Sequence, residues 1–166
     1  MGGEKVSLYP LPPLLLLQNF GGNWEAYKQA LYQIFLDTIV DKLSFLGLPI
    51  SCRYFQPIGD MHRSFWHMIT EGDLDDEKRI PDLRRCERIS WVPHLINHSD
   101  HSEILCWENK RKANINTVLW LPPESYMIIL SKRRDYYLLT TCYVHDSGKT
   151  RTNRREIEIS KDPRKS

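Results

Sequence analysis

The sequence has no long hydrophobic run. The stretch nearest to a signal peptide, Leu14–Leu17, is far shorter than the roughly 20 apolar residues that span a bilayer. Lys5 stands before this stretch, but no cleavage site with small residues follows it. We therefore expect a cytoplasmic protein that has no membrane partner.

Several catalytic motifs are also absent. The chain contains no phosphate-binding loop of the form GxxxxGKS, GxxxxGKT or GxGxxG, no HExxH and no GxSxG. These absences argue against nucleotide kinases, Rossmann enzymes, zinc proteases and α/β-hydrolases. The four cysteines form no CxxC pair and stand at positions 52, 86, 106 and 142. We interpret them as reduced core residues, with disulfides in a secreted protein as the alternative.

The composition is that of one globular domain with an uneven charge distribution. The chain has 166 residues, of which 41% are hydrophobic and 27% are charged. Residues 1–106 carry 10 Lys and Arg against 14 Asp and Glu, whereas residues 107–166 carry 13 against 7. A basic half within a nearly neutral chain indicates an anionic partner on one face, and chance asymmetry is the alternative.

The pattern of apolar residues predicts helices first and a sheet second. Apolar residues at helical spacing follow the candidate cap Asn23 and predict a helix over about 23–46, which Gly47 and Pro49 end. Four β-rich runs joined by short turns follow at 103–108, 115–121, 126–131 and 136–144. This order predicts an α+β fold in which N-terminal helices pack on a C-terminal four-stranded antiparallel sheet, a meander.

Shorter elements lie between the long helix and the sheet. They are a strand at 50–55, a helical turn or half-buried strand at 62–72, an acidic loop from Asp73 to Asp82 and a short helix at 82–89. The tail beyond His145 is basic and has a helical patch near Arg154. We divide the chain into a loosely ordered leader at 1–22, a single domain at 23–157 and a polar tail at 158–166.

Two histidines flank an aromatic pair in the segment HRSFWHMITEG. If this segment is helical, His67 and Glu71 lie one turn apart on one face, where the carboxylate can orient the imidazole. Such an imidazole can act as the general base when a 2′-hydroxyl attacks a phosphodiester, with His62 as a supporting residue. The alternative is that His67 packs beside Trp66 and that Glu71 is a surface charge.

A second group of histidines has spacings that zinc could use. The four candidate ligands are His94, His98, His101 and Cys106. Imidazoles and a thiolate suit zinc, but no second cysteine pair supports a site here. The alternative is a solvated polar loop.

Two further clusters carry groups that can contact phosphate. Arg84 and Arg88 lie one helical turn apart, and Arg85 lies three residues before Arg88. Arginine forks bind phosphate oxygens and stabilise a charged transition state, although ion pairs with neighbouring acidic residues would also explain them. On the last strand, Thr141 and Tyr143 share one face by the period of two, while Thr140 shares the other with Cys142.

Two basic loops join the predicted strands. They contain Lys110, Arg111 and Lys112, and Lys132, Arg133 and Arg134. In a meander both loops lie at the same end of the sheet, where they could guide an RNA backbone. The alternative is that these charges only keep the sheet soluble.

Taken together, five sequence blocks resemble phage-type members of the barnase/EndoU/colicin/RelE superfamily. The blocks are FWHMITEG, PDLRRCERISWV, CWENKR, YMIILSKR and YYLLTTCYV. These are small metal-independent ribonucleases of toxins and mobile elements, with N-terminal helices and a C-terminal antiparallel sheet. The resemblance runs from about residue 50 to 157, and Cys142 stands where members tend to have alanine. It implies no cofactor, and as partners it implies RNA, with tRNA as one candidate, and a cognate antitoxin or immunity protein.

The resemblance also implies roles for individual residues. His67 would be the general acid and base, Arg85 and Arg88 the phosphate ligands, and Thr141 with Tyr143 the contacts to substrate or transition state. Members vary in which side chain acts as the base, so the fold transfers better than the mechanism. Our hypothesis is a toxin-like endoribonuclease that uses the 2′-hydroxyl as nucleophile. The alternatives are a non-catalytic nucleic-acid-binding domain and a small zinc-binding interaction module.

Overall fold

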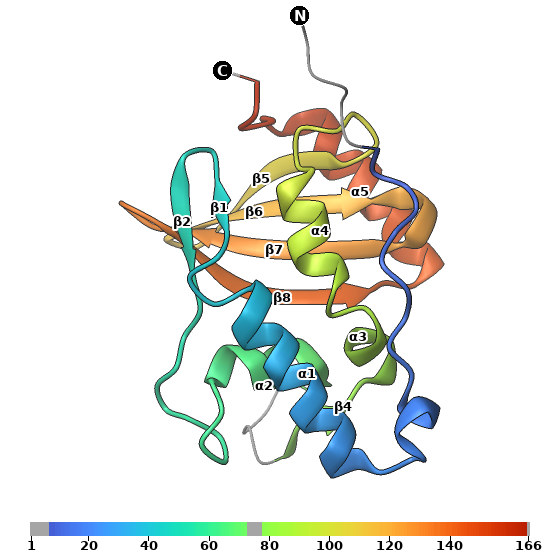
Figure 1. The fold of residues 1–166 in the computed structure, drawn as a ribbon. Coiled ribbons are helices and arrows are strands. Elements are labelled where there is room, and N and C mark those ends of the chain that lie inside the picture. Colours follow the sequence, from blue (N-terminus) through green and yellow to red (C-terminus); the bar gives the residue numbers. More distant parts are fainter. Residues whose placement is uncertain (1–6, 73–77, 166) are drawn as a thin grey trace, which may run out of the picture.

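The computed structural model describes residues 7–72 and 78–165, so residues 73–77 of the acidic loop lie outside the described ranges. Figure 1 shows helices on both sides of one large sheet. The helices are η1 (Leu17–Phe20), α1 (Trp24–Thr38), α2 (Arg63–Ile69), α3 (Leu83–Glu87), α4 (Trp91–Asn97), η3 (Pro122–Glu124) and α5 (Ser147–Ile159). The strands are β1 (Ser44–Phe45), β2 (Leu48–Ser51), β3 (Thr70–Glu71), β4 (Ile80–Pro81), β5 (Leu105–Arg111), β6 (Asn114–Leu121), β7 (Tyr126–Lys132) and β8 (Tyr137–Val144). Among the described helices, none combines the length and the apolar content needed to cross a membrane.

The main sheet has six strands and is mixed, so the prediction of a four-stranded antiparallel meander is wrong. Its order is β1-β2-β8-β7-β6-β5, and only β5 to β8 form the expected meander. Strand β2 adds to the outer edge of β8 in parallel, with Ile50 opposite Tyr137 and Ser51 opposite Leu138. Without β2, the backbone groups at this edge of β8 would have no strand partner. The sheet curves into a half-barrel.

The arrangement of the helices also differs from the prediction, because the C-terminal helix covers the second face of the sheet. The main core lies between the sheet and helices α1, α2 and α4, and includes Phe35 and Phe65, both fully buried. A smaller core on the other face is formed by Trp107, Val118, Trp120 and Met127, against which Ile157 of α5 packs. Apolar side chains on both faces of strands β5 to β7 explain why two layers of helices are needed.

Helix α1 begins where the sequence predicts but ends earlier, at Thr38 rather than near residue 46. The side chain of Asn23 caps it by accepting a hydrogen bond of 3.1 Å from the Ala26 amide. The following residues form the hairpin β1–β2, whose turn residues Leu46 and Gly47 have φ angles of 50° and 81°. Two positive φ angles in a two-residue loop are the mark of a type I′ turn. The apolar residues beyond Thr38 thus belong to a hairpin.

Both terminal segments are held closely to the domain, so the leader is not loosely packed from residue 7 onward. Leu8 is fully buried, and the Trp91 indole donates a hydrogen bond of 2.8 Å to the carbonyl of Pro12. Near the other end, Arg164 donates to the carbonyls of Ser99 and Ile104 at 2.8 and 2.7 Å. The Pro and Gly content of the leader masked these contacts, because such residues suit an extended segment as well as a disordered one.

We expect Leu46→Asn to stabilise the protein by about 0.5–1 kcal/mol. Leucine is unfavourable at positive φ, asparagine tolerates it, and Leu46 is 49% exposed, so little burial is lost. Urea denaturation of both proteins measures the difference. Leu46→Ala is the matched control, since it removes the same side chain without the asparagine preference. Equal stability of the two variants would contradict the turn argument.

Candidate active site

A polar cavity of about 390 Å³ opens beside helix α2, on a part of the second sheet face that α5 does not reach. It is lined by Arg53, Arg63, Ser64, His67, Asn114, Asn116, Ser131, Arg133, Leu138, Leu139 and Thr140. Among these described lining residues there are three arginines and one histidine, and none is Asp or Glu. The cavity is therefore suited to an anionic ligand.

Helix α2 positions two of these side chains. Its residues Phe65, Met68 and Ile69 are buried against the core, so the helix presents Arg63 and His67, one turn apart, to the cavity. Two hydrogen bonds between Ser64 and Arg53 join the helix to the preceding loop. The Ser64 amide donates to the Arg53 carbonyl at 3.0 Å, and the Ser64 hydroxyl accepts from the Arg53 amide. Arg53 is thereby placed at the same cavity.

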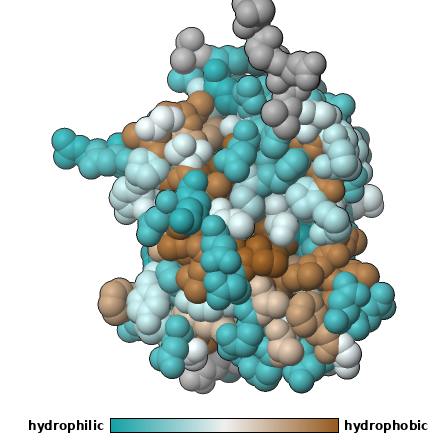
Figure 2. Space-filling model, in the orientation of Figure 1, coloured by the Kyte–Doolittle hydropathy of each residue, from teal (hydrophilic) through white to brown (hydrophobic). Residues whose placement is uncertain are grey.

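The floor of the cavity comes from strands β6, β7 and β8. Asn116 and Ser131 are direct partners across β6 and β7, and both line the cavity. At the end of the sheet, the Arg133 guanidinium donates to the Asn114 side-chain oxygen at 3.4 Å. This contact shows that the two basic loops lie at the same end of the sheet. The tip of the β7–β8 hairpin projects from the molecule (Figure 1) and has a hydrophilic surface (Figure 2).

A bulge in β8 changes the predicted division of its faces. Leu139 pairs with Leu130 and Thr141 pairs with Ile129, so Thr140 is an extra residue in the ladder. Thr140 is exposed and lines the cavity, whereas Cys142 is 1% exposed and faces the main core. The prediction that these two residues share a face is wrong, because the period of two does not hold through a bulge.

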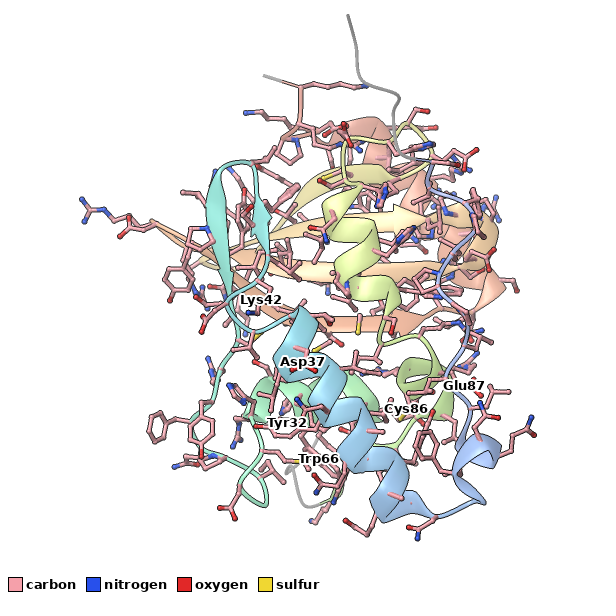
Figure 3. The ribbon with its side chains drawn as sticks, in the orientation of Figure 1. Tyr32, Asp37, Lys42, Trp66, Cys86 and Glu87 are labelled. Atoms are coloured by element: carbon pink, nitrogen blue, oxygen red, sulfur yellow. The ribbon has the colours of Figure 1, made fainter. Side chains whose placement is uncertain are left out.

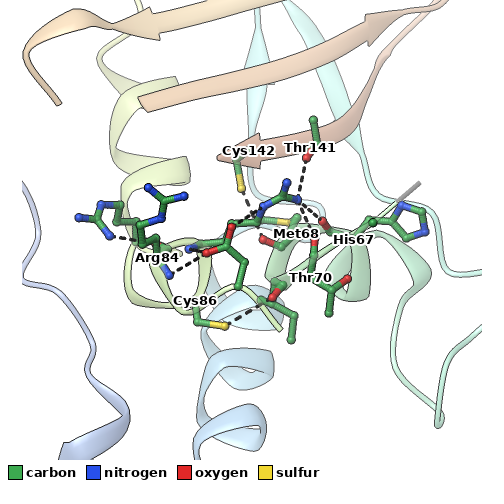
Figure 4. A network of polar contacts seen from close by, with 12 residues as sticks. His67, Met68, Thr70, Arg84, Cys86, Thr141 and Cys142 are labelled. Carbon is green, nitrogen blue, oxygen red and sulfur yellow. Dashed lines mark hydrogen bonds and ion pairs between the residues drawn. The ribbon is translucent and has the colours of Figure 1, made fainter. Parts of the chain in front are cut away.

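Arg85 joins α2, α3 and β8 in one network (Figure 4). Its guanidinium donates to the carbonyls of His67 and Thr70 at 3.1 and 2.7 Å, and to the Thr141 hydroxyl at 3.4 Å. Its Nε lies 3.3 Å from a carboxylate oxygen of Asp82, which also caps α3. Only the backbone of His67 belongs to the network, and its imidazole points away (Figure 4). Arg85 therefore positions the helix that carries His67.

Two other predicted contacts lie on either side of this network. Tyr143 is beside Arg85, whose guanidinium carbon is 5.6 Å from the centre of the tyrosine ring. Arg88 lies apart, because its guanidinium donates to the Arg84 carbonyl at 3.1 Å and lies 5.1 Å from the Trp91 ring. Arg85, Thr141 and Tyr143 are thus brought together, but neither they nor Arg88 are among the lining residues of the His67 cavity.

Neither of the two supporting residues adjoins His67 in the way the sequence suggested. Helix α2 ends at Ile69, so Glu71 lies in β3 and lines a second cavity of about 560 Å³ together with Arg84 and Arg85. His62 precedes α2 and packs against Tyr32, with 2.9 Å between its Nδ1 and the tyrosine hydroxyl. Tyr32 lies between α1 and α2 (Figure 3), so His62 belongs to an aromatic cluster.

The four candidate zinc ligands do not converge. His94 contacts the Leu8 carbonyl at 2.7 Å, and His98 contacts the His94 carbonyl at the same distance. His101 accepts a hydrogen bond from the Glu103 amide. Burial raises the pKa of the Cys106 thiol to about 12, which disfavours the thiolate that zinc requires. Within the ranges 7–72 and 78–165, no group of three or more His, Cys, Asp or Glu side chains could hold a metal ion.

Sequence reasoning missed several residues of the His67 cavity, namely Arg53, Arg63, Asn114 and Asn116. Arg63 was within reach of sequence reasoning, because it precedes His67 by four residues and a helical turn is one of the two structures predicted for 62–72. Arg53 could not, since it reaches the cavity only through the pairing of β2 with β8 and the bond to Ser64. The two asparagines carry no pattern that separates them from ordinary strand ends.

Comparison with known proteins adds no relative: no protein-family model, no curated protein and no solved structure matches the chain. The chemistry of the cavity is therefore inferred from its own geometry.

We expect acid to destabilise the protein through His62. Burial lowers the pKa of His62 below its ordinary value of 6.5. The unfolded chain then binds the proton more readily, so the free energy of unfolding decreases as the pH falls through 6.5 toward the lower pKa of the folded state. His62→Phe should remove this part of the pH dependence, as measured by urea denaturation over a pH series. His101→Phe is the control. If the free energy of unfolding of His62→Phe changed with pH as steeply as that of the wild type, His62 would not be the source of the acid sensitivity.

We expect Arg85→Lys to lower the free energy of unfolding by about 1–3 kcal/mol. A lysine ammonium cannot replace the several donors that Arg85 directs at α2, β8 and Asp82. Arg84→Lys is the matched control, because Arg84 lies on the same helix and is exposed. Denaturant unfolding compares the two variants, and equal losses would mean that the network does not hold α2 in place.

Proposed function

We propose that this protein is a metal-independent endoribonuclease. The observation that carries the proposal is the His67 cavity, in which an imidazole on a short helix faces the same space as Arg53, Arg63 and Arg133. Histidine changes its protonation state near neutral pH, and arginines bind phosphate oxygens in pairs. A site with both kinds of group, and with no carboxylate among its described lining residues, suits a phosphodiester as substrate.

In the proposed reaction, His67 accepts the proton of the RNA 2′-hydroxyl. The 2′-oxygen then forms a bond to phosphorus, and the bond between phosphorus and the 5′-oxygen breaks. The leaving oxygen takes up a proton from solvent water, which leaves a 2′,3′-cyclic phosphate and a 5′-hydroxyl end, and His67 returns its proton to the solvent. General acid–base help of this kind contributes about 10²–10⁴-fold to the rate.

The arginines act on the phosphate during this step. Arg53, Arg63 and Arg133 approach the cavity from the loop after β2, from α2 and from the β7–β8 turn. Cations on several sides stabilise the extra charge that phosphorus gains when five oxygens surround it. Arg85 acts on His67 through the backbone of α2, and we assign it a positioning role in place of direct phosphate contact.

A second reading, binding of nucleic acid without cleavage, is favoured by the basic loops. Arg133 reaches the cavity, and its contact with Asn114 brings the β5–β6 and β7–β8 loops side by side. Together these loops carry the six cationic residues Lys110, Arg111, Lys112, Lys132, Arg133 and Arg134. A binding domain of this kind would show affinity that falls steeply with salt and no turnover.

We expect purified protein to cut RNA in the presence of EDTA and His67→Ala to lower the rate by about 10²–10⁴-fold. Gel analysis of a defined RNA, with a test for 2′,3′-cyclic ends, measures both. His101→Ala is the matched control, because it removes a histidine from a loop outside the cavity. Intact RNA with the wild type would favour the binding-only reading. Cleavage that survives in His67→Ala would remove His67 from the mechanism.

A further inference from the structure

Two aromatic residues are exposed in the loop between β2 and α2. Phe55 is 75% exposed and Tyr54 is 39% exposed, although both follow a strand that enters the core. Single exposed apolar residues are common, so exposure alone does not indicate a function. What distinguishes this pair is its position next to the His67 cavity.

Hydrogen bonds place the loop at the rim of that cavity. The Arg63 amide donates to the Tyr54 carbonyl at 3.3 Å, and the Arg63 guanidinium donates to the Gln56 carbonyl at 3.3 Å. Arg53 stands immediately before Tyr54 in the chain, and both arginines line the cavity. The backbone on both sides of Phe55 is therefore bonded to a residue that faces the proposed phosphate site.

Packing beneath Phe55 gives the loop a fixed support. The Tyr54 ring is 5.2 Å from the Phe55 ring at an interplanar angle of 88°, and 5.0 Å from the His62 ring at 85°. His62 in turn contacts Tyr32 of α1. Edge-to-face packing of this kind fixes ring orientation, and it connects the exposed aromatic residue to the buried cluster between α1 and α2.

We infer that Phe55 stacks on an unpaired base of the substrate, and that the substrate is single-stranded RNA. The inference rests on the proposed function for the role of His67. An aromatic face beside cationic groups that hold the backbone is the arrangement that binds single strands, because every base has a face to stack. In a duplex both faces of a base are covered by its neighbours, so a helical stem cannot use this surface.

The chemistry around the loop favours RNA over a protein partner. The nearest charged side chains of the cavity are Arg53 and Arg63, which suit phosphate groups on either side of a stacked base. The cavity floor adds the amides of Asn114 and Asn116, which can donate to and accept from the edge of a base. Large continuous apolar patches mark sites of protein docking, whereas Tyr54 and Phe55 are two exposed rings beside cationic groups.

The test uses a fluorescent 2′-O-methyl RNA, which cannot be cleaved by 2′-oxygen attack, as a single strand and as a blunt duplex. Fluorescence anisotropy at one salt concentration gives the dissociation constants. We expect Phe55→Ala and Phe55→Leu to bind the single strand roughly ten-fold more weakly or worse, and Phe55→Trp to bind as the wild type does. The duplex should bind more weakly than the single strand and should not distinguish the variants. Ile159→Ala is the control, because Ile159 is an even more exposed apolar residue on α5.

The outcomes separate this inference from the proposed nuclease activity. Equal single-strand binding by wild type and Phe55→Ala overturns the stacking site, whether or not His67 is required for cleavage. Weaker binding by Phe55→Ala supports the stacking site even if the wild type leaves RNA intact, in which case the nuclease proposal fails alone. A comparable loss in Ile159→Ala, or an equal loss for the duplex, overturns the inference, because neither a remote residue nor a paired base can stack on Phe55. Retention of full affinity by Phe55→Leu overturns it as well.

Discussion

The position of His67 depends on how Arg85 binds the end of helix α2. Carbonyl groups at the C-terminus of a helix have no partners within the helix and carry partial negative charge. The Arg85 guanidinium satisfies two of them, those of His67 and Thr70, and also contacts the Thr141 hydroxyl on β8. Arg79 donates to the same two carbonyls, and Arg85 adds the connection from the end of α2 to the sheet. Because α2 has only seven residues, it could not hold this orientation by its own stability.

The parallel pairing of β2 with β8 is the second constraint on the site. It ends at Ser51, so the chain leaves the sheet just before Arg53 and enters the loop of Tyr54 and Phe55. The hydrogen bond between the Ser64 hydroxyl and the Arg53 amide then holds this loop against the start of α2. As a result, the cationic and aromatic groups that follow β2 in the chain stand beside groups from β6 and from the β7–β8 turn. A purely antiparallel meander would have left β8 as an open edge at this point.

The sequence predicted the elements better than their arrangement. The four strands of the meander and helix α3 follow from local periodicity and turn residues, and each lies close to its predicted bounds. The pattern at 62–72 fits a helical turn or a half-buried strand, and the structure has helix α2 there. The hairpin β1–β2 could not be recognised, since a leucine at positive φ is not a usual turn residue. Strand β2 pairs with a strand more than 80 residues away, and no local pattern indicates such a partner. The bulge at Thr140 is likewise seen only in the pairing of β7 with β8.

The same limits apply to the site. His67 was identified from its neighbours in sequence, but the residues that share its cavity come from β6, β7, β8 and the loop after β2. Arg85 was selected for its charge, whereas the structure shows that its donors are used by the protein itself. A charged side chain in a motif can bind a ligand or stabilise the fold. The hydrogen bonds that it makes within the protein indicate which of these roles it has.

Three cavities on the sheet face that carries α5 share lining residues, and together they form one groove. Asn116 lines both the His67 cavity and a smaller one of about 150 Å³, and Tyr143 and Lys149 line both the smaller cavity and the second large one. The groove thus runs from the Phe55 loop, past the sheet floor, to the start of α5. Its floor and its α5 side come from residues after 107, which carry the excess of positive charge. The second large cavity has three carboxylates against three Arg and Lys side chains, whereas the His67 cavity has arginines and no carboxylate among its described lining residues. A polyanion in this groove would therefore be held mainly at the His67 cavity.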